Sequence, residues 1–119
     1  VLVIHGRRDD VNPYASGAGA RWPTGIGPTV RAWAGQSDAR VTGRRAELER
    51  GVTEQTLDVA GSVGRTVHLV TLDEVGHGWP GNRDALCRKQ FGSSGAWSAT
   101  AHLSRFFAGF DDADSVVDR

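Results

Sequence analysis

An uninterrupted apolar run, Val1 to Ile4, constrains the fold most, because it is closed at once by His5, Gly6 and a charged turn. Three of its four residues are β-branched, and no polar residue alternates with them, as in strands that are buried on both faces of a parallel sheet. Such a strand needs neighbouring strands. None precedes this run, and neither does an initiator Met, so we expect the natural start of the protein to lie upstream of Val1.

The segments that follow predict further elements of an α/β arrangement. Thr29 is predicted to cap a helix over 30–38, whose apolar residues at positions i, i+3 and i+4 share one face. The segments 52–59 and 66–72 are predicted to pair as a hairpin across a glycine-containing turn. The first and last strands are then parallel and joined by a right-handed crossover.

Irregular segments and one more helix account for the rest of the chain. The segments predicted to be irregular are residues 9–28, 40–50, 73–81, 82–95 and 111–119. Among them, 40–50 is a densely charged and solvated connection, and 111–119 is an acidic tail. Ser98 is expected to cap a final amphipathic helix. We therefore predict that residues 1–110 are part of a single α/β domain.

Composition excludes several classes of protein and binding site. The 119 residues include 14 basic and 14 acidic ones, so the chain has no general attraction to nucleic acid or anionic lipid. No apolar stretch approaches the roughly 20 residues of a membrane span. Cys87 is the single cysteine, which excludes an internal disulfide and a cysteine-rich zinc site, and we predict no metal and no cofactor. Two parallel strands without their central neighbours would expose an apolar face, so we expect the chain to be marginally stable or to self-associate.

An acid and a histidine follow the two predicted parallel strands. Asp9 and Asp10 come a few residues after the first strand, and His77 lies between Gly76 and Gly78 after the last one. Because open α/β sheets bind their ligands at the carboxyl ends of their strands, these side chains are expected at one edge of the sheet. An acid that precedes a histidine matches the chain order in α/β-hydrolases, where the histidine is the general base and the carboxylate orients it.

Other polar residues fit structural roles better. An Asp in a turn after a strand commonly bonds its own backbone, and His5, His68 and His102 are expected to be structural, solvent-facing or satisfied by hydrogen bonds. Ser37 lies at the end of a predicted helix rather than on a strand-to-helix turn, so it does not fit a nucleophile elbow. Cys87 is interpreted as a spare, half-exposed thiol.

Two segments, residues 5–14 and 76–81, resemble the acid-bearing and histidine-bearing segments of secreted polyhydroxybutyrate depolymerases and feruloyl or acetylxylan esterase-like α/β-hydrolases. Residues 95–100 are similar to the start of the closing helix of that family. The resemblance implies that the catalytic acid falls on Asp9 and the catalytic histidine on His77. It also implies the C-terminal portion of an α/β-hydrolase fold, without the N-terminal half that carries the nucleophile elbow and the oxyanion hole.

The resemblance implies the C-terminal fragment of a secreted, extracellular serine esterase. Its substrates would be short-chain polyhydroxyalkanoates or feruloyl or acetyl esters of polysaccharides. Tyr14 and Trp79, two amphipathic aromatic residues near the catalytic loops, are candidates to line an acyl or aryl pocket. Without a nucleophile or an oxyanion hole, the isolated chain is expected to be inactive.

Two other interpretations stay open. The chain is alternatively a non-catalytic interaction domain that has kept a hydrolase-like shape, or a degenerate gene product. It is also compatible with the terminal part of a prolyl oligopeptidase-like serine peptidase, since such peptidases share the strand followed by His-Gly-x-x-Asp at residues 5–9. The coding sequence upstream of Val1 discriminates among them.

Overall fold

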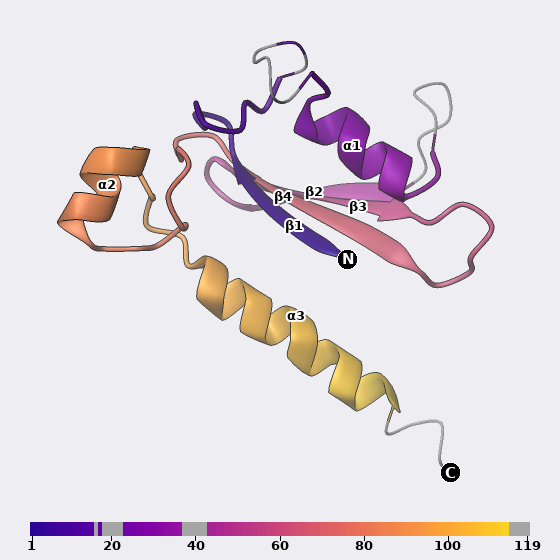
Figure 1. The fold of residues 1–119 in the computed structure, drawn as a ribbon. Coiled ribbons are helices and arrows are strands. Elements are labelled where there is room, and N and C mark those ends of the chain that lie inside the picture. Colours follow the sequence, from indigo (N-terminus) through magenta and orange to yellow (C-terminus); the bar gives the residue numbers. More distant parts are fainter. Residues whose placement is uncertain (16, 18–22, 37–42, 115–119) are drawn as a thin grey trace.

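The computed structural model describes residues 1–15, 17, 23–36 and 43–114, which form a small mixed α/β domain (Figure 1). Its elements in chain order are β1 (Leu2–Gly6), α1 (Ile26–Trp33), β2 (Gly43–Glu49), β3 (Val52–Asp58), β4 (Thr66–Leu72), α2 (Ala85–Phe91) and α3 (Ala99–Asp114). None of the helices in these described ranges has the length and apolar character needed to cross a membrane.

The four described strands form one sheet in the order β1-β4-β3-β2. β1 and β4 are parallel, with Leu2 opposite His68 and Gly6 opposite Leu72. β3 is antiparallel to β4 on one side and to β2 on the other. The predicted hairpin of 52–59 with 66–72 is therefore confirmed, and so is the parallel pairing of the first strand with 66–72.

Apolar clusters lie on both faces of the sheet, and β4 is its most buried strand. On one face Val67 and Leu69 pack with Val30 of α1, and on the other Val70 and Leu72 pack with residues that include Val52, Val75 and Trp97. Alternate side chains of a strand point to opposite faces, so the apolar residues of β4 supply both clusters. In Figure 1, α1 lies on one side of the sheet and α3 on the other.

The prediction that residues 40–50 form a solvated connection is wrong for residues 43–49, which are strand β2. Every residue of β2 is exposed, so charged side chains are tolerated on both of its faces. The backbone of β3 supplies the hydrogen-bonding partners, with an irregularity in register between Glu47 and Glu49. Residues 40–42 lie outside the described residues.

Helix α1 begins and ends earlier than predicted. It starts at Ile26 after Gly25, and Thr29, the predicted cap, lies inside the helix, where its hydroxyl donates to the carbonyl of Gly25 at 2.9 Å. Pro28 fits the first turn because the amide N–H groups there have no partner within the helix. The helix gives way to Gly35, whose φ of 66° favours glycine. The last predicted helical residues, 37 and 38, lie outside the described residues.

The C-terminal part of the chain has one helix more than predicted. Within the predicted loop 82–95, Asp84 caps α2 by accepting a hydrogen bond from the backbone N–H of Cys87 at 2.7 Å. The cap of α3 at Ser98 is confirmed, because its hydroxyl accepts from the backbone N–H of Ala101 at 3.2 Å. α3 continues to Asp114, so its last turn falls in the predicted acidic tail, of which 115–119 lie outside the described residues.

Candidate active site

The segments that follow β1 and β4 run side by side at the carboxyl ends of these two strands. The backbone N–H of Arg7 donates to the carbonyl of Leu72 at 2.9 Å, and that of Arg8 donates to the carbonyl of Val75, also at 2.9 Å. Gly6 permits this close approach, since a Cβ at this position would lie 2.1 Å from the carbonyl oxygen of Val75. The parallel pairing of β1 and β4 therefore brings the two loops together.

Asp9 is a buried acid whose two oxygens have different partners. Oδ1 accepts hydrogen bonds from the backbone N–H groups of Val11 at 2.9 Å and Asn12 at 2.7 Å. Oδ2 lies 2.9 Å from Nδ1 of His77. The side chain is thus both a turn-forming Asp that bonds its own backbone and the partner of a histidine 68 residues further along the chain. Asp10 is exposed.

The backbone around His77 is held by the last residue of α2 and by the segment that follows it. The N–H of His77 donates to the carbonyl of Phe91 at 2.8 Å, and the ring of Phe91 contacts the imidazole edge-on. The N–H of Gly76 donates to the carbonyl of Ser93 at 2.8 Å. A Cβ on Gly76 would lie 2.5 Å from the carbonyl oxygen of Phe91, so glycine is required there.

The hydrogen bond to Asp9 determines which nitrogen of His77 is available for chemistry. A carboxylate only accepts, so Nδ1 carries the proton, and in the neutral ring Nε2 keeps its lone pair. The side chain of His77 is 31% exposed, whereas that of Asp9 is 5% exposed. Within the described ranges, Asp9 is the only residue that hydrogen-bonds to this imidazole. An imidazole whose tautomer is fixed in this way by a carboxylate is able to accept a proton at Nε2.

A cavity of about 170 Å³ lies at Asp9 and His77, which we call the acid–base pair. The residues that line it are Ile4, His5, Gly6, Asp9, Asn12, Gly76, His77, Gly78, Trp79 and Pro80. Trp79, a predicted substrate-binding residue, is half exposed, and its indole N–H donates to the hydroxyl of Thr100 at 3.0 Å. Tyr14, the other predicted one, is not in this lining, and its hydroxyl lies 3.1 Å from that of Thr71.

No nucleophile accompanies the pair in the part of the chain that the structure describes. Cys87 is on α2 and does not line the cavity. Ser94 is buried and its hydroxyl donates to the carbonyl of Asn82. Ser37, whose sequence context does not fit a nucleophile elbow, lies outside the described residues. The described residues therefore bring together a base and its carboxylate, without a hydroxyl or thiol bonded to the base.

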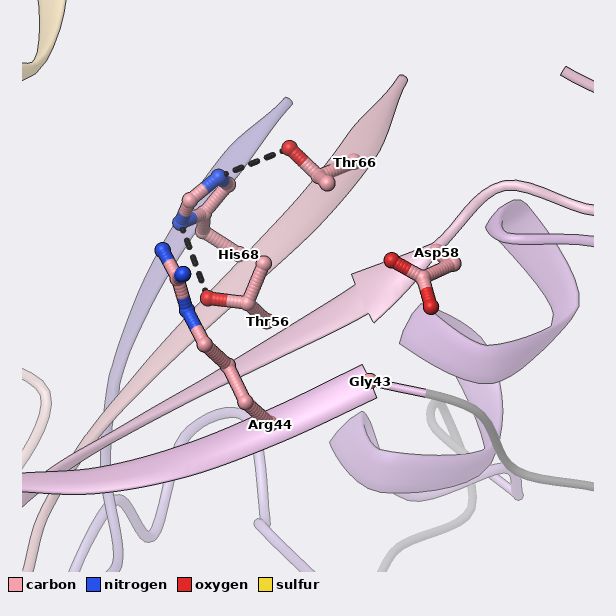
Figure 2. Close-up of a pocket in the computed structure, with 6 residues that line it drawn as sticks. All are labelled: Gly43, Arg44, Thr56, Asp58, Thr66 and His68. Atoms are coloured by element: carbon pink, nitrogen blue, oxygen red, sulfur yellow. Dashed lines mark hydrogen bonds between the residues drawn. The ribbon is translucent and has the colours of Figure 1, made fainter. Parts of the chain in front are cut away.

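A second, larger cavity of about 390 Å³ lies away from the pair, over the strands β2, β3 and β4 (Figure 2). His68 lies in it with both ring nitrogens engaged, Nε2 with the hydroxyl of Thr66 at 2.9 Å and Nδ1 with Glu54 at 2.9 Å. The expectation that hydrogen bonds satisfy His68 is confirmed. No group of three or more His, Cys, Asp or Glu residues in the described segments could hold a metal ion.

His102 differs from the expectation that it faces solvent or is satisfied by hydrogen bonds. Its side chain is only 15% exposed, and its buried Nε2 has no hydrogen-bond partner among the described residues. The nearest carboxylate oxygen, Oε1 of Glu54, is 3.9 Å away. Burial lowers the pKa of His102 below its ordinary value, and the charges of Arg105 and His68 act in the same direction against that of Glu54. The sequence gives no signal for this contact between α3 and β3.

Comparison of the chain with models of protein families, with curated proteins and with solved structures found no match.

Proposed function

We propose that this chain supplies the general base and its orienting carboxylate to a serine hydrolase that cleaves carboxylic esters. The observation that carries the proposal is the 2.9 Å contact between Oδ2 of buried Asp9 and Nδ1 of partly exposed His77. The pair lies at the carboxyl ends of parallel strands, where α/β proteins place their ligands. The resemblance of residues 5–14 and 76–81 to esterase-like α/β-hydrolases supports the ester class.

In the proposed mechanism Nε2 of His77 removes the proton of a serine hydroxyl as the serine oxygen attacks the ester carbonyl. The negative charge of Asp9 stabilises the imidazolium that forms. His77 then gives the proton to the departing alkoxide, which leaves as an alcohol, and the acyl group stays on the serine. Water hydrolyses this acyl-enzyme in the same way, with His77 again as base, and releases a carboxylic acid and the free serine.

The serine and the oxyanion donors come, in this proposal, from a segment outside residues 1–119. This assignment is supported by the absence of a hydroxyl or thiol bonded to His77 among the described residues. Trp79 lines the cavity next to His77 and is placed to contact the acyl or alcohol part of a substrate. By resemblance, we further propose an extracellular enzyme acting on short-chain polyhydroxyalkanoates or on feruloyl or acetyl esters of polysaccharides, as the C-terminal portion of an α/β-hydrolase fold.

The test compares the 119-residue chain with the longer product of the same reading frame on chromogenic acetate and butyrate esters. We expect hydrolysis by the longer product only. His77→Ala then lowers kcat on the order of a millionfold, because the base is lost, and Asp9→Asn lowers it about ten-thousandfold, because the tautomer is no longer fixed. Asp10→Asn is the matched control: it removes an exposed neighbouring carboxylate and should change kcat by less than about twofold.

Three outcomes would contradict the proposal. Ester turnover by the 119-residue chain itself, abolished by His77→Ala, would place the nucleophile within these residues. A reading frame without Gly-x-Ser-x-Gly upstream of Val1 would favour an interaction domain or a degenerate gene product. Cleavage of peptides in place of esters would favour the prolyl oligopeptidase-like alternative.

A further inference from the structure

A second histidine lies at the candidate active site and takes no part in the acid–base pair. His5 belongs to β1, where it is opposite Thr71 of β4. Its side chain is 12% exposed and its ring lies against that of Tyr14, with 5.9 Å between the centroids. A ring so enclosed, on a strand that is paired to its neighbour, has little freedom to move.

Among the described residues, the one hydrogen bond of the His5 ring connects it to the segment that holds Asp9. Nε2 of His5 lies 2.8 Å from the carbonyl oxygen of Asn12. A carbonyl oxygen only accepts, so Nε2 carries the proton and donates it. The N–H of the same Asn12 donates to Oδ1 of Asp9 at 2.7 Å, and Oδ2 of Asp9 accepts from His77 at 2.9 Å. Three hydrogen bonds in series therefore connect β1 to the imidazole of His77.

The distances also show that His5 does not compete with His77 for the carboxylate. Nε2 of His5 is 3.7 Å from Oδ2 of Asp9, which is too far for a hydrogen bond, whereas Nδ1 of His77 is 2.9 Å from the same oxygen. His5 donates a hydrogen bond to the carbonyl of Asn12, and the N–H of Asn12 donates one to Oδ1 of Asp9. With Oδ1 fixed in this way, the rotation of the carboxyl group is restricted to the one that points Oδ2 at His77.

We infer that His5 is a positioning residue, which acts through the backbone of Asn12 to hold the carboxylate of Asp9 against Nδ1 of His77. The inference rests on the proposed function, because the orientation of Asp9 affects a reaction only if His77 is the base. It assigns opposite tautomers to the two histidines. In the neutral rings the proton is on Nε2 of His5 and on Nδ1 of His77.

The experiment is ¹⁵N nuclear magnetic resonance of the histidine rings in the whole 119-residue chain, which reports the tautomer of each ring. His5→Phe keeps an aromatic ring and removes the donor. We expect the ratio of the Nδ1–H to the Nε2–H tautomer of His77 to fall about fivefold, the effect of one hydrogen bond of ordinary strength. His5→Gln restores an N–H donor of similar reach and should return the ratio to within about twofold of the original. His102→Phe, at a histidine outside this series, is the control and should leave the ratio unchanged.

The inference is overturned if His5→Phe keeps the original ratio, or if His5→Gln behaves as His5→Phe does while its amide spectrum stays native. It is also overturned if His5 of the unaltered chain carries its proton on Nδ1. Should His5→Phe fail to fold, the tautomer of His5 and the His5→Gln variant still decide the question. No ester is turned over in this experiment, so failure of the esterase proposal and failure of this inference give different results.

Discussion

The side chain of Asp9 makes both local contacts in its own turn and a long-range contact with His77. Its Oδ1 closes the turn after β1 by accepting from two backbone N–H groups, and its Oδ2 pairs with His77. The turn-forming and the histidine-orienting roles of an Asp after a strand are therefore compatible. With Oδ1 bonded to the turn, Oδ2 lies 2.9 Å from Nδ1 of His77.

The sequence predicts that Asp9 and His77 lie close together. It does not predict which groups fix the position of the Asp9 carboxylate. Two predicted parallel strands, each followed by a polar residue, suffice to place the two side chains at one edge. The carboxylate of Asp9 accepts hydrogen bonds from the backbone of Val11 and Asn12, and the ring of His5 donates to the carbonyl of Asn12. These contacts depend on the exact path of a turn, which the residue types in it do not specify.

The close approach of the two loops predicts the effect of a single methyl group. In Gly6→Ala the new Cβ would lie 2.1 Å from a backbone oxygen of Val75, so one of the two segments has to move. We expect the free energy of unfolding to fall by about 3 kcal/mol, measured by urea titration. Gly109→Ala in α3 is the matched control, because nothing lies within 4 Å of its new Cβ, and it should raise stability by up to about 1 kcal/mol. Equal effects of the two changes would show that the approach at Gly6 is not tight.

Among the elements, those specified by burial or by a cap follow from the sequence, and short or charged segments do not. The apolar strand β4 and the start of α3 follow from the sequence because burial and a cap specify them. β2 is not predicted, because both of its faces are exposed to solvent and its sequence therefore shows no alternation of apolar and polar residues. α2 was missed because seven residues, none of them buried, carry little periodic signal, although Asp84 was available as a cap.

The contact of α3 with β3 predicts a dependence of stability on pH. Burial lowers the pKa of His102 in the folded chain, so below its ordinary value of 6.5 the unfolded chain binds more protons than the folded one. The contribution of this group is therefore complete above about pH 6.5 and is lost as the pH falls. We expect the urea midpoint to drop between about pH 7.5 and about pH 5.5.

The His102→Phe variant isolates this effect, since it keeps a ring beside Trp97 and cannot titrate. Glu54, His68 and Arg105 stay in place in the variant, so their contributions remain in both proteins. The drop in midpoint should be smaller in His102→Phe than in the unaltered chain. Identical drops in the two proteins would assign the pH dependence to other groups.

For the molecule as a whole, the position of the candidate site depends on the pairing of the strands in the sheet. β4 is buried on both faces and holds β1 on one side and the antiparallel pair β3 and β2 on the other. The apolar run at residues 1–4 indicated parallel pairing, which β1 makes with β4, but the sheet is mixed. β1 is at one edge of the described sheet, with its side chains only partly buried. Self-association of the chain stays a prediction.

The proposed pairing of His77 with a serine is tested by labelling the longer product of the reading frame with a fluorophosphonate, which reacts with activated serines. The label is then mapped by mass spectrometry. We predict one label per chain, on a serine outside residues 1–119. We also predict that labelling slows more than about a thousandfold in His77→Ala, because the proton of the serine then has no acceptor. A label on a residue within 1–119, or labelling at an unchanged rate without His77, would contradict the proposed pairing.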